Sequence, residues 1–318
     1  MSWFSFYPLV LLAALVLDAL IGDPPVRLHP VRLLGGGIDY LWRKRPQGGN
    51  RFLLLWGVLI CLAGLATVIV LTLPLHVFAR NSVGWRGMAA VLMSAFCLKF
   101  SLSARGLFHE ALKVRRALET GDLPLARRLT ERNLVSRSLV DADSAAICSA
   151  VIESLNENFV DSIASPILFF CVGGLPAAWA YRFINTADAM LGYRHGDREW
   201  GGKCAARLDD ALNWIPARLC GALLALSAML PGWNGQQSLL IMKRDASRCS
   251  SPNSGWPMAA AAGALGIRLE KAGHYIINPE GRLPQPKDIQ KGILLISTAL
   301  CLLIVLIILP VILYYGYL

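Results

Sequence analysis

The sequence predicts an all-α protein, a polytopic integral membrane helical bundle with cytoplasmic helical loops. Of its 318 residues, 55% are hydrophobic and 16% are charged, whereas about a quarter of the residues in a typical soluble domain are charged. Residues 52–79 form a block of 28 residues without a formal charge, and about 20 apolar residues suffice for a helix to cross a bilayer. Lysine and arginine are concentrated between such blocks, as is typical of cytoplasmic loops. That distribution accounts for the net charge of +10 and argues against a nucleic-acid partner.

The apolar blocks give the order of the expected elements. We expect apolar spans near 3–21, 52–79, 88–103, 144–181, 211–231 and 292–314, separated by polar islands at 22–51, 104–143, 182–210 and 233–291. The first block lacks a basic leader and a cleavage site, so we interpret it as a retained helix. Because basic islands flank the next two blocks, these should form a hairpin through the periplasmic side. We treat residues 1–318 as a single membrane-embedded domain in the cell inner (cytoplasmic) membrane.

The topology of the C-terminal half stays open. Islands 182–210 and 233–291 contain five and eight Lys/Arg, which favours the cytoplasmic side for both, but one predicted helix separates them. Either one island lies outside, or residues 144–181 cross twice or re-enter, which is tolerated only where the backbone is buried or lines a cavity. Island 104–143 is predicted to form two soluble helices. The first ends near Glu119, and a Gly-Asp-Leu-Pro break follows at 121–124.

An acidic stripe lies in the apolar stretch 144–161, which contains no Gly or Pro and therefore predicts a helix. At 100° per residue, Glu153, Glu157 and Asp161 share an arc of about 80°. An unpaired charge in hydrocarbon costs about 2.5–3.5 kcal/mol on insertion scales, so these carboxylates must face protein, water or cations. Ion pairs with Arg137 or Arg182, a proton or ion pathway, and a Mg²⁺ shared with a phosphate substrate all remain open. We favour Mg²⁺.

Three further clusters repeat this chemistry, in which acids and amides lie beside arginines and suit a magnesium–phosphate site. They are Asn185 with Asp188; Asp209, Asp210 and Asn213 with Arg218; and Arg244 with Ser251 and Asn253. Each alone is weak evidence, because Asp and Asn at helix ends are usually caps. The segment "GDREWGGKC" departs from a phosphate-binding loop at Asp197 and Cys204. The histidines and the eight cysteines show no metal-binding spacing, and we expect neither a zinc site nor a disulfide framework.

Four ordered stretches carry a resemblance to a known family: "LDALIGDPPVRLHPVRLLG", "RNLVSRSLVDADSAAICSAVIESLNENFVDSIASPI", "RFINTADAMLGYR…ARLDDALNWIPAR" and "SPNSGWPMAAAAGALGIRLEKAG". Over residues 10–278 the chain resembles the CobD/CbiB family of cobalamin-pathway membrane proteins, the adenosylcobinamide-phosphate synthases. The resemblance implies an acid–amine ligase that uses ATP and Mg²⁺. It would join adenosylcobyric acid to (R)-1-amino-2-propanol or its O-phosphate and give adenosylcobinamide or its phosphate.

On this resemblance we assign expected roles. Glu153, Glu157 and Asp161 would hold Mg²⁺ for ATP, and Asp188, Asp209, Asp210 and Asn213 would be catalytic, completing the metal shell or accepting the proton of the amine. Substrate and phosphate binding would fall to Arg137, Arg218, Arg244, Asn158, Asn185, Ser251 and Asn253. Asp23 and His29 would line the same cytoplasmic face, toward which the active site opens, although a rigid helix exit at Pro24-Pro25 is the simpler interpretation of that stretch.

Further partners follow from the resemblance. Expected partners are the corrinoid substrate, the amine, membrane lipids and other cobalamin-pathway enzymes, and self-association stays open. The alternative function is a membrane transporter or ion-coupled channel that uses the same intramembrane carboxylates.

Overall fold

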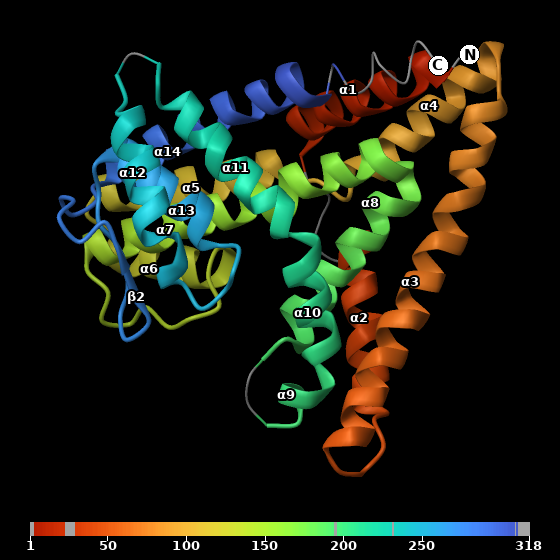
Figure 1. Ribbon diagram of the computed structural model, residues 1–318, viewed down its shortest axis with the longest axis horizontal. Coiled ribbons are helices and arrows are strands. Elements are labelled where there is room, and N and C mark those ends of the chain that lie inside the picture. Colours follow the sequence, from red (N-terminus) through yellow and green to blue (C-terminus); the bar gives the residue numbers. More distant parts are fainter. Residues whose placement is uncertain (1–2, 23–28, 194–195, 231, 309, 311–318) are drawn as a thin grey trace. The chain divides into compact units, whose positions relative to one another are not determined.

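The computed structural model describes residues 3–22, 29–193, 196–230, 232–308 and 310, and these are helical almost throughout (Figure 1). Within them, four helical segments are long and apolar enough to cross a membrane: Asn50–Asn81, Gly84–Glu119, Ser144–Leu191 and Pro286–Leu306. Two shorter apolar helices cover Phe6–Ile21 and Trp214–Ser227. The predicted all-α, polytopic membrane fold is therefore confirmed.

The chain forms two compact units. Unit 1 consists of residues 1–103, 165–212 and 308–318, and unit 2 consists of residues 104–164 and 213–307. Both units are discontinuous in sequence, because the long helical segment 144–191 begins in unit 2 and ends in unit 1.

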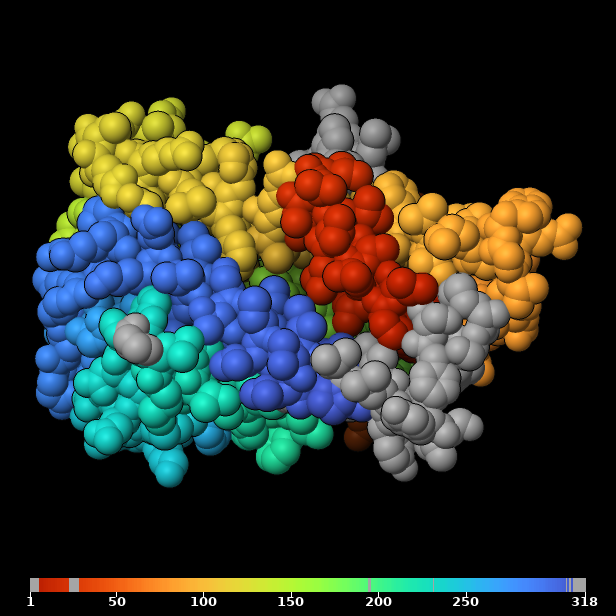
Figure 2. Space-filling view, turned by 90° about the horizontal axis from the view of Figure 1, so that it is seen from above, coloured from red at the N-terminus to blue at the C-terminus, as the bar shows by residue number. Residues whose placement is uncertain are grey.

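Unit 1 is built from helices α1 (Trp3–Ile21), α2 (Pro30–Arg43), α3 (Asn50–Asn81), α4 (Gly84–Lys99), α8 (Ser165–Leu191), α9 (Arg198–Gly201) and α10 (Lys203–Leu212). Helix α3 packs along α8, and α2 also packs on α8 (Figure 1). Trp42, Ile60 and Phe183 are buried in the shared core. The outer face of α1, red in Figure 2, exposes Leu12 and Leu20, as expected of a helix in lipid.

Helix α8 contains a break at Gly173 and Gly174, where the dihedral angles are not helical. Gly174 has φ of +65°, and a Cβ atom there would lie 2.2 Å from Cε1 of His76 in α3. Only glycine satisfies both the left-handed backbone and this close approach. The break therefore lets α8 change direction against α3.

Unit 2 contains α5 (Ala104–Glu119), α6 (Leu123–Asn133), α7 (Ser144–Phe159), the π-helical turn η2 (Val160–Ala164), α11 (Trp214–Ser227), α12 (Gly235–Asp245), the 3₁₀ turn η3 (Ala246–Arg248), α13 (Gly255–Leu265), strands β1 (Leu269–Lys271) and β2 (Tyr275–Ile277), α14 (Pro286–Leu303) and, at its end, the π-helical turn η4 (Ile304–Ile308). Helix α7 is central, since it contacts α5, α6, α13, α14 and β1. In Figure 2, α14 (blue) lies on the surface of this unit beside α5 (yellow).

The two helices predicted in island 104–143 are present as α5 and α6. The first ends at Glu119, and Gly121 follows with φ of +78°. Asp122 caps the second, because its carboxylate accepts a hydrogen bond of 2.9 Å from the backbone N–H of Leu125. The break works because Gly121 adopts the left-handed region without strain and Asp122 satisfies a free helix donor.

Three expected elements need correction. The helix predicted over 144–161 is α-helical only to Phe159, and Asp161 lies in the π-helical turn, so the 100° spacing does not extend to Asp161. The span predicted at 211–231 is the 14-residue helix α11, which at 1.5 Å per residue is about 21 Å long and shorter than the hydrocarbon core. The helix predicted at 88–103 lies at Gly84–Lys99.

Candidate functional site

The central helix α7 carries Glu153, a carboxylate that is only 3% exposed. It accepts hydrogen bonds from Nη2 of Arg137 at 3.0 Å, from the hydroxyl of Tyr275 at 2.8 Å and from Oγ of Ser149 at 2.6 Å. A buried charge is tolerated when it is paired and hydrogen-bonded. An ion pair with Arg137 was one of the alternatives for the acidic stripe. It is present, and it holds Glu153 in place.

A β-hairpin brings Tyr275 and Lys271 to α7. In the pairing of β1 with β2, Lys271 lies opposite Tyr275 and Leu269 lies opposite Ile277. The strands are joined through Gly273, which has φ of +73°, and the N–H of His274 donates to the carbonyl of Lys271 at 2.9 Å, as in a type II turn. Side chains alternate along a strand, so Lys271 and Tyr275 share the face of the buried Leu269.

The hairpin is also bonded to α7 through its backbone. The N–H of Glu270 donates to Oγ of Ser149 at 2.8 Å, and the same hydroxyl donates to Glu153. The pKa of Tyr275 is raised by burial and by the negative charges of Glu153 and Glu157. Tyr275 is therefore held as a neutral hydroxyl that donates to Glu153.

Glu157 lies one turn beyond Glu153 on the same face of α7 and is half-buried. It interacts electrostatically with Glu153, Lys271 and Arg137. Glu153 has its oxygens occupied by three donors, whereas no hydrogen bond or ion pair holds Glu157 among the residues that the structure describes. Glu157 is therefore the carboxylate of the stripe that is open to a ligand.

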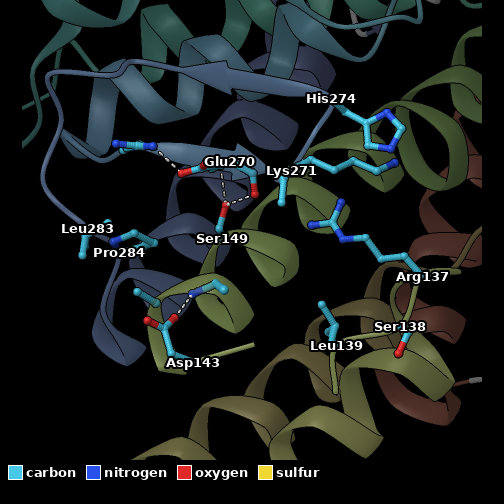
Figure 3. Close-up of a pocket in the computed structure, with 14 residues that line it drawn as sticks. Arg137, Ser138, Leu139, Asp143, Ser149, Glu270, Lys271, His274, Leu283 and Pro284 are labelled. Atoms are coloured by element: carbon cyan, nitrogen blue, oxygen red, sulfur yellow. Dashed lines mark hydrogen bonds and ion pairs between the residues drawn. The ribbon is translucent and has the colours of Figure 1, made fainter. Parts of the chain in front are cut away.

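A cavity of about 490 Å³ lies against this helix and hairpin (Figure 3). Its lining is mixed, with cationic, acidic, hydroxyl and apolar side chains: Arg137, Ser138, Leu139, Asp143, Ala145, Ala146, Ser149, Arg268, Glu270, Lys271, Ala272, His274, Leu283 and Pro284. In Figure 3, Arg137, Lys271 and His274 lie together on one side, and Leu283 and Pro284 lie on the other. The volume is within the range of small-molecule sites.

A second predicted group in unit 2 gathers around Arg218. Its guanidinium carbon lies 4.1 Å from the ring centroid of Trp214 and 4.8 Å from that of Trp256. Nη1 donates to the carbonyl of Trp214 at 2.7 Å and to Oδ1 of Asn253 at 3.4 Å, and Oγ of Ser251 accepts from the N–H of Asn253 at 3.2 Å. The structure therefore brings Arg218, Ser251 and Asn253 together, with the guanidinium fixed between two indoles.

Arg244 belongs to a different network, around the fully buried Asp245. Asp245 accepts two hydrogen bonds of 2.9 Å from Arg244, an ion pair from Arg248 at 2.9 Å, and the backbone N–H of Asn278 at 2.7 Å. Burial raises the pKa of Asp245, but the hydrogen bonds from Arg244 and Asn278 and the charges of both arginines outweigh it and hold the pKa below its usual value. Because Arg244 also pairs with Glu280 at 2.9 Å, its guanidinium anchors the end of the hairpin.

In unit 1, four predicted residues from two segments meet. Nδ2 of Asn185 in α8 donates to Oδ1 of Asp209 in α10 at 3.2 Å, and Asp188 lies close enough to Asp209 and Asp210 to interact with both charges. Nη1 of Arg182 donates to Oδ1 of Asn185 at 3.3 Å. This cluster of three carboxylates is held at the contact between α8 and α10.

The remaining predicted residues lie elsewhere. Asn158 donates to the carbonyl of Ser154 at 3.0 Å, Asp161 interacts electrostatically with Cys220 of α11, and Asn213 is buried at the start of α11. His29 caps α2 by accepting from the N–H of Val31 at 3.2 Å. Asp23 lies outside the described residues.

The carboxylates of these clusters fit Mg²⁺ only as part of a smaller ligand set. Across the part of the chain that the structure describes, no three His, Cys, Asp or Glu side chains are grouped to hold a metal ion. Mg²⁺ is commonly bound by only one or two carboxylates, with water and substrate phosphates as the other ligands. Glu157, or the pair of Asp188 and Asp209, suits this smaller ligand requirement, whereas Glu153 already accepts three hydrogen bonds.

The sequence did not single out four residues that line the cavity: Ser149, Arg268, Lys271 and His274. It also did not single out Tyr275, which bonds the hairpin to Glu153. Lys271 and His274 flank Ala272 and Gly273, and an apolar–charged alternation ending in such a turn is the available signal for a hairpin. Nothing in the sequence indicates that this hairpin packs on α7, which lies about 120 residues earlier.

The fold and these charged clusters define a multi-pass helical membrane protein with buried ionisable sites. The CobD/Cbib protein family matches residues 11–303. The chain is 36% identical over 294 residues to "Cobalamin biosynthesis protein CobD" of Dehalococcoides mccartyi, covering 92% of this chain and 94% of that protein. It is 42% identical over 268 residues to "Probable cobalamin biosynthesis protein CobD" of Methanothermobacter thermautotrophicus, covering 84% and 86%.

A third relative, "Cobalamin biosynthesis protein CobD" of Klebsiella pneumoniae, is 37% identical over 264 residues, covering 82% of each chain. No solved structure matches the chain. The chain belongs to the CobD/CbiB family.

Proposed function

We propose that this protein is an enzyme of cobalamin biosynthesis that forms an amide from adenosylcobyric acid and (R)-1-amino-2-propanol or its O-phosphate, using ATP and Mg²⁺. Membership of the CobD/CbiB family supports the role in cobalamin biosynthesis. The observation that supports ATP-dependent chemistry is the electrostatic interaction of the half-buried Glu157 with a paired carboxylate, Glu153, and with the cations Arg137 and Lys271.

The reaction needs activation of a carboxylate. In the proposed sequence, an oxygen of the corrinoid carboxylate takes a phosphoryl group as a phosphoanhydride bond of ATP breaks. The amine then attacks the acyl carbon, phosphate leaves, and a base accepts the amine proton. Phosphoryl transfer depends mainly on positioning and on neutralisation of negative charge.

The residues of unit 2 suit those demands. Arg137 is fixed by Glu153, so its guanidinium can meet a phosphate with little loss of side-chain entropy. Lys271 adds a second positive charge from the hairpin. Bound Mg²⁺ would neutralise charge on the phosphates, and Glu157 is the carboxylate of α7 that we assign to hold it. Asp209 and its neighbour Asp188 in unit 1 are the further candidates for a proton acceptor or metal ligand.

The localisation is part of the proposal. ATP is available in the cytoplasm, so the enzyme would lie in the cell inner membrane with its site open to the cytoplasmic side. The long apolar helices support membrane embedding.

The test is amide formation by the purified protein in lipid nanodiscs, followed by the mass of the corrinoid. The wild type should give the amide only with ATP and Mg²⁺, and Glu157→Gln should lose at least about 100-fold in rate if it removes a charge used in the transition state. Glu199→Gln is the matched control, because Glu199 is exposed.

Two results would count against the proposal. Full activity in Glu157→Gln would remove the metal role of Glu157. Absence of amide with every amine tested, in folded wild-type protein, would contradict the ligase and favour the alternative of transport, which predicts substrate flux in sealed vesicles without ATP consumption.

A further inference from the structure

The cavity of unit 2 has a cationic side built from two separate segments. Arg137 comes from the loop that precedes α7, and Lys271 and His274 come from the two ends of the β-hairpin turn. These three side chains lie near one another in Figure 3. Of these residues, the sequence singled out only Arg137 as a phosphate binder.

The acidic residues of the cavity are already engaged. The carboxylate of Glu270 accepts from Nη2 of Arg268 at 2.5 Å, and that of Asp143 caps α7 by accepting from the N–H of Ala146 at 2.8 Å. Among the described residues, no carboxylate lies within 4.0 Å of the ammonium group of Lys271. Lys271 interacts electrostatically with Glu157 but makes no ion pair with a described residue, so its ammonium group keeps its donors for a ligand.

Arg137 and Arg268 each have N–H donors that no described residue accepts. Arg137 binds Glu153 through Nη2 only, and a guanidinium group has five N–H donors in a planar fork. Nε of Arg268 is buried and has no hydrogen-bond partner in the described structure, although a buried donor without a partner costs about 1–3 kcal/mol. An anionic ligand with several oxygens would satisfy these groups.

The N-terminus of helix α7 also favours an anion in the cavity. Ala145 and Ala146 of its first turn line the cavity, and the N-terminus of a helix carries a partial positive charge that favours anions. Ser138 and Ser149 add hydroxyl groups to the lining. The hydrogen bond from Tyr275 to Glu153 holds the hairpin against α7, so Lys271 and His274 are pre-positioned.

We propose that this cavity binds a phosphate group through Arg137, Lys271 and His274. The ligand is a phosphate ester or anhydride, and two sources fit the chemistry, the phosphates of ATP and a phosphorylated amino alcohol. The choice between these sources rests on the proposed function, but binding of phosphate does not.

The test is isothermal titration calorimetry on the full-length protein in nanodiscs. The probes are ATP, aminopropanol O-phosphate and inorganic phosphate, with unphosphorylated aminopropanol as the ligand control. Lys271→Met should weaken binding of the phosphorylated probe about 10-fold, as expected for loss of one charge-assisted hydrogen bond, and His274→Gln should weaken it less. The matched control is Lys287→Met, which removes an exposed lysine outside the cavity and should leave the affinity unchanged.

The outcomes separate the two proposals. Loss of affinity for ATP alone in Lys271→Met assigns the cavity to the nucleotide, and loss for aminopropanol O-phosphate alone assigns it to the amine substrate. Equal affinity in Lys271→Met and Lys287→Met, or no binding of any phosphate to the wild type, overturns the inference even if amide forms. Lys271-dependent phosphate binding in a protein that makes no amide supports the inference and counts against the ligase.

Discussion

The hydroxyl group of Tyr275 donates a hydrogen bond of 2.8 Å to Oε2 of Glu153, a residue 122 positions earlier in the chain. This bond joins the β-hairpin to the central helix of unit 2. Because the same carboxylate oxygen accepts from Arg137, one buried charge fixes the positions of two segments that line the cavity. Glu153 is therefore a positioning residue, and its partners are as important as its charge.

Replacing Tyr275 by phenylalanine should destabilise the protein. The change removes a hydrogen bond to a buried charged group, which is worth about 1.5–3 kcal/mol, while the ring is retained. The measurement is the free energy of unfolding of the detergent-solubilised protein in denaturant. Tyr40→Phe, at a tyrosine that is 60% exposed, should have little effect, and equal losses in the two variants would contradict the role of the bond.

Asp245→Asn should loosen the hairpin as well as lower stability. It leaves Arg244 and Arg248 without their buried anion, and breaking a buried ion pair by removing one partner costs about 3–5 kcal/mol. The readout is hydrogen–deuterium exchange of the amides in residues 269–278, which should become faster than in the wild type. Glu280→Gln removes the exposed partner of Arg244 and should leave the exchange unchanged.

The pH dependence of stability follows from the carboxylate of Asp245. Its pKa in the folded protein lies below the usual value, so the stabilisation is fully present above the unfolded pKa of about 3.9 and is lost as the pH falls through the lower folded pKa. The free energy of unfolding should fall with decreasing pH below about 4 in the wild type and fall less steeply in Asp245→Asn. Parallel curves for the two proteins would argue against this assignment.

Asp188→Asn should raise stability and lower activity. Asp188 interacts with the like charges of Asp209 and Asp210, so neutralising it removes repulsion, for which a gain of about 0.5–1 kcal/mol is typical. The proposed function uses these carboxylates, so the rate of amide formation should decrease at least about 10-fold. The melting temperature and the corrinoid product are measured on the same preparation. A variant that is both less stable and fully active would contradict the prediction.

Gly174→Ala should destabilise unit 1 more than Gly84→Ala. Both glycines have positive φ, +65° and +61°, and a left-handed conformation costs a non-glycine residue about 1–2 kcal/mol. At Gly174 the new Cβ would also meet the ring of His76, whereas at Gly84 nothing lies within 4 Å. Thermal unfolding of the two variants compares a backbone penalty alone with the same penalty plus a clash, and equal melting temperatures would show that the ring of His76 moves freely.

The extent to which the site could be predicted depends on the sequence distance between its parts. Glu153 and Glu157 are one turn apart, so helical periodicity was sufficient to place them on one face. Arg218 and Asn253 were predicted separately, and only the fold shows that they are hydrogen-bonded. Lys271 and His274 were not singled out, because their importance depends on contacts with a helix more than 100 residues away.

Arg244 shows the opposite limitation. Its position near Ser251 and Asn253 in the sequence suggested a phosphate binder, but its guanidinium is engaged by Asp245 and Glu280. A sequence gives the residue types near one another in the chain, but it does not show which of their donors are already satisfied by distant partners.

By itself, the sequence determined the class of the protein, most of its helices and the α5–α6 hairpin, because hydropathy, helical periodicity and turn residues are local properties of the chain. The tertiary structure alone decided that α7 stops at a π-helical turn, that Glu153 is saturated by three donors, and that a hairpin completes a cationic cavity against α7. These features arise from hydrogen bonds and packing between segments far apart in the chain. The free energy of burying a charge depends on those distant partners and not on its neighbours in sequence.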